Sequence, residues 1–593
     1  MINQNITEII KSKKRAGVSF PLFSLFTKKS FAVGDIYSLE VLGEWSQKSG
    51  ITIIQILPLN DLGFGRSPYS SISAFAIDPV YISLYLLGIE DLDLDIQNRF
   101  DDKVKIKERK LKILKEHFNK IINDDIIRNI NNFIQRNDWL NEYISFVILN
   151  YEFNGVHWSL WQKQFSLELV TDLRNKNELE FYFIAWLQLI AFEQLKEQKL
   201  KLQNKGVYLK GDMPILTSDH SADVWARTFL FNRDLRSGAP PDYFNAEGQN
   251  WGFPVIDWRE MKKEKYSWWK MRLEYLENFY HLYRIDHVLG MYRIWAIPKG
   301  KESAKYGFFH PQKGVSRKEF NQARLFPEDF EKLGLIYEFK SDHYIFYWDF
   351  FKTNQYQSLP EEIKAKFYPL SELHLKIDEE HWKKAGEEIL NFLFENSSML
   401  PCAEDLGAVP SFVRDSIHEM KLLGLDIIRW TRSFEDGSYI KPEGYRKVAV
   451  SSLSVHDTST ALGWWLEASE NDRKEFAKLF KHDEVNKNKL SEEIKPITLD
   501  EIPGLLLEVA MKCSSQFSIH MLQDYILSGA LGMERNGNTG ILKDPNKQKI
   551  NTPGSPEDKN WGYVFPFYAE DLLEDLELTK NIKELIKMNG RLV

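Results

Sequence analysis

The chain has 593 residues, of which 43% are hydrophobic, 14% aromatic and 27% charged, and its formal net charge is −8. This is the composition of a globular protein with a large buried core and excludes a disordered chain. The acidic balance argues against a nucleic-acid partner, because phosphate binding usually needs a basic face.

Cysteine content and hydropathy indicate where in the cell the protein is expected. Two cysteines, Cys402 and Cys513, argue against a disulfide scaffold. The segment Met1–Arg15 lacks the continuous apolar core of a secretory signal, and no run approaches the roughly 18 apolar residues that cross a bilayer. We therefore expect a cytoplasmic protein without a membrane span or a lipid anchor.

Eight short runs rich in β-branched or aromatic residues recur along the chain, with helical stretches between them. This alternation is typical of a parallel α/β architecture, and eight strand–helix units close naturally into a TIM (β/α)₈ barrel. The predicted strands lie at Gly17–Phe23, Ile51–Leu59, Val207–Ile215, Leu282–Leu289, Met399–Glu404, Leu425–Trp430, Val448–His456 and Phe517–Gln523.

Two long segments interrupt this series. Residues 88–203 are predicted to form a helical subdomain inserted between strands 2 and 3, and residues 301–397 an enlarged insertion between strands 4 and 5. The first prediction rests on apolar residues that recur with helical spacing in Lys103–Ile122, namely Val104, Ile106, Leu111, Leu114 and Phe118. No low-complexity linker is evident, so we expect residues 1–593 to form a single elaborated catalytic barrel.

Three of the predicted strands deliver a carboxylate at their C-terminal ends: Asp286, Glu404 and Asp457. Barrel enzymes carry their chemistry at this end of the strands. Glycosidic-bond chemistry needs two carboxyl groups, one ionised to attack or stabilise the sugar C1 and one protonated to give its proton to the leaving oxygen. Asp286 suits the first role, because the nearby Arg284 should keep its pKa low. Glu404 suits the second, because apolar neighbours and no adjacent cation should raise its pKa. Asp457 suits hydrogen bonding to sugar hydroxyls.

Other interpretations of these residues stay open. An Arg two positions from an Asp, as in Arg284 and Asp286, is more often a structural ion pair than a catalytic one. His287 and His456, taken singly, would be hydrogen-bonded structural histidines. A metal site is a third reading of Asp, Glu and His together. We expect no metal, because no pair of these residues has tight zinc-type spacing.

A turn-rich loop with aromatic residues lies between the third and fourth strands, at Gly238–Phe244 and Gly248–Pro254. Loops of this kind position ligands. Aromatic faces stack on the C–H faces of sugars, and the amide of Gln249 could read hydroxyl orientation. For any single tryptophan, including Trp251, core packing is the alternative.

At these residues the sequence resembles the 4-α-glucanotransferases, the amylomaltase or disproportionating-enzyme family known as glycoside hydrolase family 77. The matching motifs run in family order from residue 56 to residue 554. They are Ile56-Leu57-Pro58-Leu59, Ser67-Pro68-Tyr69, Ser73-Ala74-Phe75-Ala76, Gly211-Asp212-Met213-Pro214-Ile215, Gly238-Ala239-Pro240-Pro241-Asp242, Gly248-Gln249-Asn250-Trp251-Gly252, Arg284-Ile285-Asp286-His287, Ala403-Glu404-Asp405-Leu406-Gly407, His456-Asp457 and Asn551-Thr552-Pro553-Gly554.

The resemblance implies a retaining transfer of α-1,4-glucan segments on an α-amylase-like barrel, with no metal or organic cofactor. Donors would be malto-oligosaccharides or an α-glucan polymer, and acceptors glucose or malto-oligosaccharides. It implies Asp286 as the nucleophile, Glu404 as the acid/base and Asp457 as the transition-state stabiliser. The implied substrate-binding residues are Ser67, Tyr69, Asp212, Gln249, Trp251, Arg284, His287, Asp405, His456 and Asn551.

The sequence departs from the family pattern in three places. The segment Lys301–Ser397 is longer than in compact bacterial members and resembles the enlarged connection of some plant cytosolic relatives. Thr458-Ser459-Thr460 follow the third carboxylate, where compact members commonly have an amide and a small polar residue. The segment Leu425–Trp430 also differs from the apolar sequence that the family usually has there. The main alternative function is a retaining α-1,4-glucan hydrolase, and the other is a non-catalytic glucan-binding protein. The sequence leaves the oligomeric state open.

Overall fold

The computed structural model describes residues 2–89, 103–241, 245–433, 435–481, 501–529, 544–555 and 559–593. Its centre is an eight-stranded parallel sheet in the order β12-β6-β3-β2-β1-β15-β14-β13. The strands are β1 (Arg15–Phe20), β2 (Ile53–Ile56), β3 (Tyr208–Met213), β6 (Leu282–Ile285), β12 (Leu400–Ala403), β13 (Gly424–Ile427), β14 (Ala449–Ser452) and β15 (Phe517–Met521). Each overlaps one predicted run, and the predicted barrel is confirmed.

The sheet closes on itself where its two end strands meet. Cys402 of β12 forms a parallel bridge with Leu423, next to β13, and the backbone N–H of Ala403 donates to the carbonyl oxygen of Leu423 at 2.7 Å. Neighbours in the barrel are therefore neighbours in the chain order of the strands. Since all eight strands run in parallel, the residues that follow them gather at one end of the barrel.

The barrel interior is packed closely at its N-terminal half. Every residue of β1 is buried, and a Cβ atom added to Gly17 would come within 2.9 Å of a side-chain carbon of Ile519 and 3.0 Å of Cβ of Ile53. These two residues belong to the strands on either side of β1. Glycine at position 17 therefore lets three strands pack with bulky residues on both sides.

Two buried arginines tie down the N-terminal end of the barrel. The guanidinium of Arg591 is fully buried and donates to the backbone carbonyls of five residues: Met511, Cys513, Ser515, Gln516 and Arg15. Arg15 donates in turn to the carbonyls of Ile9 and Ile10 in α1 (Ile2–Lys11). These bonds connect the start of β1, the approach to β15 and the C-terminal segment.

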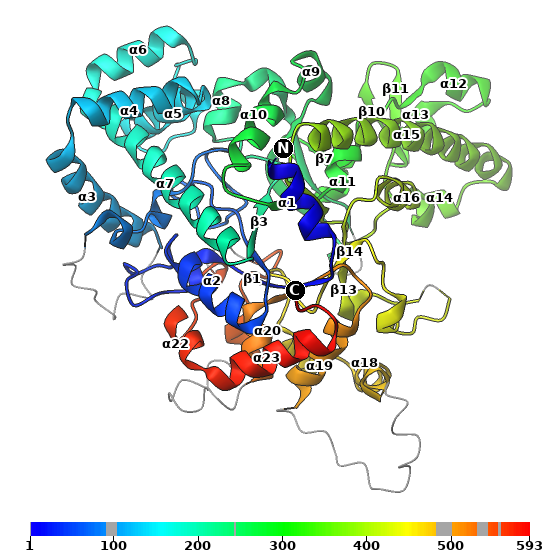
Figure 1. Cartoon of the computed structure of the whole chain (residues 1–593). Coiled ribbons are helices and arrows are strands. Elements are labelled where there is room, and N and C mark those ends of the chain that lie inside the picture. Colours follow the sequence, from blue (N-terminus) through cyan, green and yellow to red (C-terminus); the bar gives the residue numbers. More distant parts are fainter. Residues whose placement is uncertain are drawn as a thin grey trace, which may run out of the picture.

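In the described part of the chain between β2 and β3, five α-helices form the group at the upper left of Figure 1. They are α3 (Lys103–Ile121), α4 (Asp124–Gln135), α5 (Trp139–Glu152), α6 (Leu167–Lys176) and α7 (Glu178–Asn204). Lys107 of α3 pairs with Asp61 and, at 3.1 Å, with Asp78, and Tyr143 of α5 donates to Asp61 at 2.6 Å. These contacts fix the helices to the loop after β2. Residues 90–102 lie outside the described ranges, and the bounds 88–203 stay a prediction.

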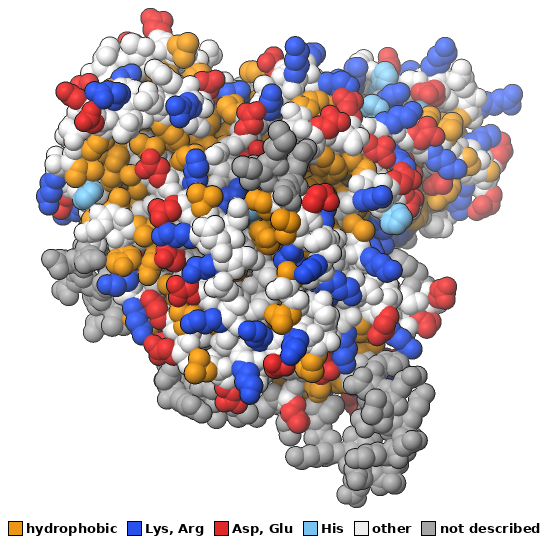
Figure 2. Space-filling view, viewed as in Figure 1, with side chains coloured by type: hydrophobic (Ala, Val, Ile, Leu, Met, Phe, Trp, Pro, Cys, Tyr) orange, Lys and Arg blue, Asp and Glu red, His pale blue; other side chains and the backbone are white. Residues whose placement is uncertain are grey.

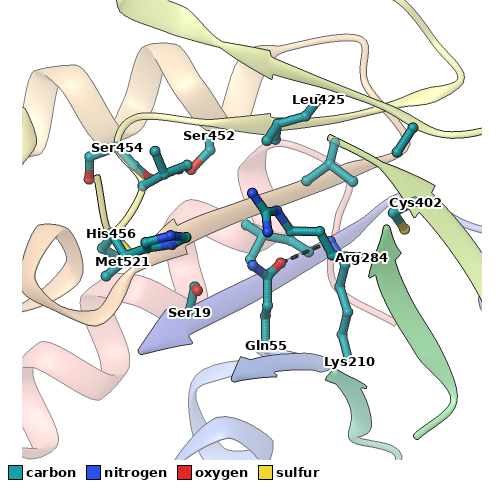
Figure 3. Close-up of a pocket in the computed structure, with 14 residues that line it drawn as sticks. Ser19, Gln55, Lys210, Arg284, Cys402, Leu425, Ser452, Ser454, His456 and Met521 are labelled. Carbon is teal, nitrogen blue, oxygen red and sulfur yellow. Dashed lines mark hydrogen bonds between the residues drawn. The ribbon is translucent and has the colours of Figure 1, made fainter. Parts of the chain in front are cut away.

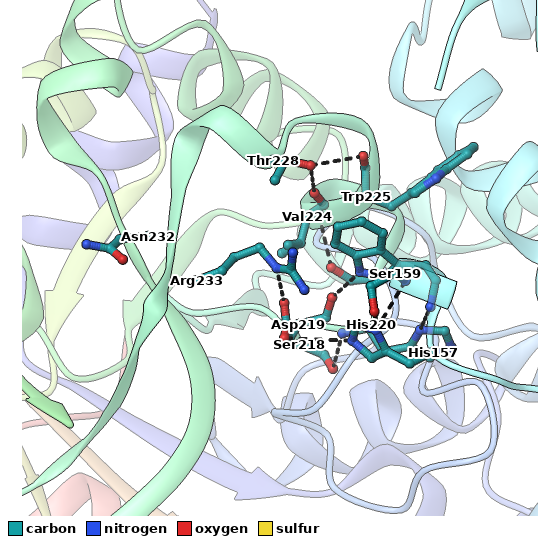
Figure 4. Close-up of polar contacts among 12 residues, drawn as sticks. His157, Ser159, Ser218, Asp219, His220, Val224, Trp225, Thr228, Asn232 and Arg233 are labelled. Carbon is teal, nitrogen blue, oxygen red and sulfur yellow. Dashed lines mark hydrogen bonds and ion pairs between the residues drawn. The ribbon is translucent and has the colours of Figure 1, made fainter. Parts of the chain in front are cut away.

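A polar cluster joins the same helical segment to the loop after β3 (Figure 4). Asp219 accepts hydrogen bonds from Nε of Arg233 and from Nη2 of Arg236, both at 2.8 Å. Its backbone oxygen accepts from Nε1 of Trp158 at 2.6 Å. Because Arg233 and Arg236 lie in β4 (Phe231–Ala239), the cluster holds the helical segment, the loop after β3 and this strand together.

The strand β4 belongs to a four-stranded antiparallel sheet outside the barrel, in the order β5-β4-β7-β8. Its other strands are β5 (Gln249–Ile256), β7 (Ile294–Pro298) and β8 (Phe308–His310). The predicted aromatic loop is therefore a β-hairpin whose second strand starts with Gln249. Its residues Asp242, Tyr243 and Phe244 lie outside the described residues.

A further unit stands between β6 and β12, at the upper right of Figure 1. It combines a small sheet, in the order β10-β11-β9, with the long helix α15 (Glu361–Glu395). The strands are β9 (Val315–Ser316), β10 (Ile336–Lys340) and β11 (His343–Phe346). The unit has an apolar cluster of its own, which includes Phe320, Phe330 and Phe367. The bounds 301–397 stay a prediction.

Acidic and basic side chains are intermixed over the face shown in Figure 2. The long helices among the described residues all carry too much polar sequence to traverse a bilayer. Cys402 and Cys513 are both free and buried.

The arginine at position 591 provides a test of how the barrel is held closed. Arg591→Met keeps an apolar chain of similar length but leaves buried carbonyl groups without donors, so we expect the free energy of unfolding to fall by on the order of 3 kcal/mol. Urea unfolding followed by tryptophan fluorescence measures this change. Arg128→Met, at an exposed position of α4, is the matched control and should shift the midpoint little. Equal midpoints for the two variants would contradict the role given to Arg591.

Candidate active site

The backbone brings two of the predicted catalytic carboxyls to neighbouring positions at the C-terminal end of the barrel. Asp286 directly follows Ile285 of β6, and Glu404 follows Ala403 of β12. Backbone hydrogen bonds between the two strands continue past the strand ends. The N–H of Glu404 donates to the carbonyl of Ile285 at 2.9 Å, and the N–H of Val288 donates to the carbonyl of Glu404 at 3.2 Å. The two carboxyls are thus placed by regular backbone.

The guanidinium of Arg284 lies at the centre of the predicted site. Its Nη1 donates to both carboxylate oxygens of Asp212 at 2.9 Å and lies 2.7 Å from Oδ1 of Asp286. Its Nη2 lies 3.9 Å from Oε2 of Glu404. Strand register explains the first contact, because Arg284 in β6 is paired with Asp212 in β3. One buried cation therefore faces three carboxyl groups.

A second chain of polar contacts leads from Asp212 to the third carboxylate. The hydroxyl of Tyr69 donates to Oδ2 of Asp212 at 2.8 Å and lies 3.0 Å from Nε2 of His456, while the two rings stack with centroids 5.4 Å apart. Nε2 of His456 lies 3.2 Å from Oδ2 of Asp457, and Nδ2 of Asn551 donates to Oδ1 of Asp457 at 2.6 Å. Both oxygens of Asp457 are therefore oriented, yet its side chain keeps 40% exposure and is accessible to a ligand.

Backbone donors orient Glu404 from two sides. The N–H of His287 donates to Oε2 and the N–H of Leu406 to Oε1, both at 2.9 Å. His287 has a φ of 47°, in the left-handed region that residues with a Cβ rarely adopt. Such local strain persists where surrounding structure holds it, often at functional sites. Here it accompanies the bond that orients the Glu404 carboxyl.

The hairpin outside the barrel contributes an aromatic side chain to the same region. The ring of Trp251 in β5 meets that of His287 edge-on, with centroids 5.0 Å apart and an interplanar angle of 87°. Nε1 of Trp251 donates to Oε1 of Gln249 at 3.1 Å. Trp251 and Gln249 are therefore joined to the carboxyl site through His287.

Burial dominates the ionisation of the two central carboxyls. It raises the pKa of Asp286 to about 6, and the carboxylates of Asp212 and Glu404 raise it too, although Arg284 opposes this. The expectation of a low Asp286 pKa was wrong: Arg284 lies as close as predicted, but it is shared with Asp212 and cannot offset the loss of water. Burial also raises the pKa of Glu404, as expected, against the opposing effect of Arg284 and the two backbone donors. The run that carries Glu404 has no cation of its own, and the cation near this carboxyl, Arg284, comes from the neighbouring strand β6.

The third carboxylate has the opposite character. Burial alone would raise the pKa of Asp457, but His456 and the hydrogen bond from Asn551 outweigh it and lower the pKa to about 2. The carboxylate of Asp457 in turn raises the pKa of His456, against the opposing effect of burial. Asp457 is therefore a carboxylate over the whole range in which Asp286 and Glu404 titrate.

Two predicted binding residues make contacts with groups other than the three catalytic carboxyls. Asp405 pairs with Nη1 of Arg446 at 2.8 Å, and its other oxygen accepts from the N–H of Leu425 at 2.7 Å. Its side chain is almost completely buried and joins β12 to β13. The hydroxyl of Ser67 accepts from the N–H of Tyr69 at 3.3 Å and so helps shape the turn that carries Tyr69.

Sequence reasoning missed a residue beneath the site. Lys210 of β3 is buried and donates to Oε1 of Gln55 at 2.8 Å in a cavity of about 30 Å³ inside the barrel, which Arg284, Cys402 and His456 also line (Figure 3). Burial lowers the pKa of Lys210. A lysine inside a strand that is buried throughout was the available signal, because lysines are almost never fully buried without a partner.

No group of three or more potential ligands with metal-binding geometry occurs in the described ranges. The carboxylates that could bind a metal are already paired with other side chains. Those of Asp212 and Asp286 face Arg284, and that of Asp457 faces His456 and Asn551. The arrangement is suited to proton transfer and nucleophilic attack by carboxyl groups.

Comparison with known proteins agrees with this architecture. The sequence profile of glycoside hydrolase family 77, described as 4-alpha-glucanotransferase, matches residues 20–568. A 4-alpha-glucanotransferase of Chlamydia pneumoniae is 30% identical over 98% of this chain and 96% of its own length, and one of Oryza sativa is 27% identical over 97% and 70%. The structure of an amylomaltase from Streptococcus agalactiae in complex with acarbose has a TM-score of 0.71 at 21% identity, covering 98% of this chain and all of that one. This chain belongs to glycoside hydrolase family 77, the 4-alpha-glucanotransferase family.

Proposed function

We propose that this protein is a 4-alpha-glucanotransferase that disproportionates malto-oligosaccharides by a retaining double displacement through a glycosyl ester of Asp286. The observation that carries the proposal is the pair of half-buried carboxyls at the ends of adjacent barrel strands, Asp286 and Glu404, which face the two Nη atoms of Arg284. A retaining mechanism requires a nucleophile and an acid/base that flank one glycosidic bond.

The placement of the proton between the two carboxyls follows from their distances to Arg284. Asp286 is in direct contact at 2.7 Å, whereas Glu404 is 3.9 Å away, so the guanidinium stabilises a negative charge on Asp286 more strongly. Two neighbouring carboxyls titrate as a pair, and ionisation of one raises the pKa of the other. The single proton therefore belongs on Glu404, which is the state that the first step needs.

In the first step the Asp286 carboxylate attacks C1 of the donor sugar while Glu404 gives its proton to the glycosidic oxygen. The bond between C1 and that oxygen breaks, and the reducing-end part of the donor leaves with a new 4-hydroxyl group. In the second step a 4-hydroxyl of the acceptor attacks C1, the ionised Glu404 takes the hydroxyl proton, and the ester to Asp286 breaks. One glycosidic bond is made for each one broken, so the number of reducing ends stays constant.

The transition states of both steps carry positive charge on the sugar ring. Asp457 is ionised and keeps 40% exposure, and its orientation is fixed by His456 and Asn551. A preoriented carboxylate stabilises such a charge without having to reorganise. Asp457 therefore suits the role of transition-state stabiliser, with Tyr69 and His456 as further contacts of the reacting sugar.

Transfer instead of hydrolysis requires that a sugar, and not water, meets the glycosyl ester. Trp251 stands over His287, whose backbone N–H orients the acid/base, so a sugar stacked on Trp251 would lie on the acceptor side of the ester. Excluding water there favours the acceptor hydroxyl. We propose glucose or malto-oligosaccharides as acceptors, and malto-oligosaccharides or an α-glucan polymer such as glycogen or starch as donors, in the cytoplasm. The 4-alpha-glucanotransferases among the relatives support α-glucans as the substrate class.

Incubation with maltotriose alone tests the activity and the roles of both carboxyls. We expect glucose and a ladder of longer glucans at constant reducing ends, lost in Asp286→Asn and reduced by about 10²- to 10⁴-fold in Glu404→Gln. Fluoride leaves without a proton, so Glu404→Gln should still release fluoride from α-maltosyl fluoride in a first turnover, whereas Asp286→Asn should not. Rising reducing ends without a ladder would indicate a hydrolase, and equal losses on both donors would remove the acid role from Glu404.

The raised pKa of Asp286 gives a pH prediction. Asp286 attacks only as a carboxylate, and with a pKa of about 6 it becomes protonated as the pH falls through that value. We expect kcat/KM for maltotriose to fall on the acid side with an apparent pKa near 6, which is the macroscopic value of the pair, rather than near ~4 as for an ordinary aspartate. Circular dichroism over the same range controls for unfolding. An acid limb near ~4 in a folded protein would contradict the burial assigned to this carboxyl.

The acceptor-side role of Trp251 is tested by product ratios. Trp251→Ala should raise the ratio of hydrolysis to transfer, measured as reducing ends formed per mole of glucan transferred from maltotriose, because water then reaches the ester more easily. Trp258, which stacks on Trp269 away from His287, offers the matched control, and Trp258→Ala should leave the ratio unchanged. An unchanged ratio in Trp251→Ala would remove Trp251 from acceptor selection.

A further inference from the structure

A second cavity lies outside the barrel, in the unit between β6 and β12. Its volume is about 130 Å³, and it opens between β11, the short helix η8 (Phe350–Lys352) and one side of α15. We call it the insertion groove. The lining residues used below are Phe309, Trp348, Asp349, Phe351, Tyr368 and Asp378.

The wall of the insertion groove carries aromatic side chains that remain exposed. Trp348 is 41% exposed, and Phe351 and Tyr368 are exposed to a similar extent. The ring of Trp348 is nevertheless held in place, because it meets Phe309 edge-on at 5.1 Å and Trp295 at 5.9 Å. A fixed, exposed tryptophan beside two further exposed rings marks a binding surface rather than a core.

A carboxyl group lies among these rings. Asp378 of α15 is only 6% exposed and lines the groove, and the N–H of Lys313 donates to its Oδ1 over a long distance of 3.5 Å. A buried carboxyl that is so weakly satisfied is a strong acceptor for hydroxyl donors from a ligand. Asp349, which also lines the groove, has a φ of 55°, the kind of backbone strain that often accompanies ligand sites.

Size and chemistry together select the occupant. A cavity of about 150 Å³ accommodates one six-membered ring, so a groove of about 130 Å³ that is open to solvent fits a single sugar residue of a longer chain. Flat aromatic faces match the C–H faces of a hexose, and Asp378 matches its hydroxyl groups. Ligand sites generally combine apolar walls with a few placed polar groups in this way.

A series of contacts links the insertion groove to the hairpin that carries Trp251. Trp348 contacts Trp295, which lies in β7 and is paired with Gly238 of β4. Gly238 is paired in turn with Asn250 of β5, the residue between Gln249 and Trp251. The antiparallel sheet therefore carries the groove at one side and the proposed acceptor platform at the other.

We propose that the insertion groove is a second binding site for an α-1,4-glucan chain, separate from the catalytic carboxyls, that holds a polymeric donor or acceptor on the enzyme. The identity of the ligand rests on the proposed function. A site of this kind contributes affinity for long glucans by raising the local concentration of chain ends at the barrel, and it contributes nothing for substrates too short to reach both positions.

Affinity electrophoresis of the full chain in gels that contain soluble glycogen tests the proposal. Trp348→Ala and Asp378→Asn should each weaken retardation by about tenfold, because each removes one ring or one acceptor from the ligand. Phe326→Ala is the matched control, since Phe326 belongs to the same unit and is 65% exposed but does not line the groove. Disproportionation of maltotriose should be unchanged in all three variants.

The outcomes separate this proposal from the proposed function. Retardation that depends on Trp348, with or without a maltotriose ladder, supports the groove as a glucan site. A maltotriose ladder together with retardation equal in Trp348→Ala, Asp378→Asn and the intact chain overturns the groove while leaving the catalytic assignment intact. Equal weakening by Phe326→Ala also overturns it, since the effect would then belong to the unit as a whole.

Discussion

The buried guanidinium of Arg284 is the interaction on which the site depends. Three carboxyl groups cannot be withdrawn from water at the end of one barrel without a cation among them. Arg284 meets Asp212 through both carboxylate oxygens and Asp286 through one, and its second nitrogen faces Glu404. Its two terminal nitrogens divide these contacts, because Nη1 meets the two aspartates and Nη2 faces the glutamate, so one planar group spans all three carboxyls.

The barrel supplies the precision that this cluster requires. Arg284 and Asp212 face each other because β6 and β3 pair in parallel, and Glu404 is tied to Ile285 by a hydrogen bond that continues the ladder beyond β12. The residues proposed to contact the sugar lie outside the barrel strands, with Tyr69 on a turn after β2 and Trp251 in β5 of the hairpin. The barrel strands thus hold the proposed catalytic carboxyls, and the connections between strands hold the proposed sugar contacts.

The eight strands could be predicted from sequence because each is a short buried run, and the carboxylates could be found because they end such runs. The ionisation of Asp286 could not be predicted in this way. The neighbouring sequence shows Arg284 but not Asp212, which comes from another strand and pairs with the same guanidinium nitrogen. The position of Asp405 was hidden for a similar reason, since its partner Arg446 lies 41 residues away in the chain. Motif neighbours indicate which residues meet, whereas burial and shared partners decide the charge that each one carries.

The balance of charge at the site gives a reason why a half-buried nucleophile with a raised pKa suits the proposed reaction. The three carboxylates of Asp212, Asp286 and Asp457 face one guanidinium, that of Arg284, and the raised pKa of His456 favours a second positive charge that offsets part of the excess. In the free enzyme this excess of negative charge is unfavourable, and water around the exposed part of Asp286 relieves it. In the proposed mechanism a bound sugar displaces that water, and relief then comes from the positive charge that develops on the ring. The ionised carboxylates are then better matched to the proposed transition state than to the ground state, which is the condition for catalysis.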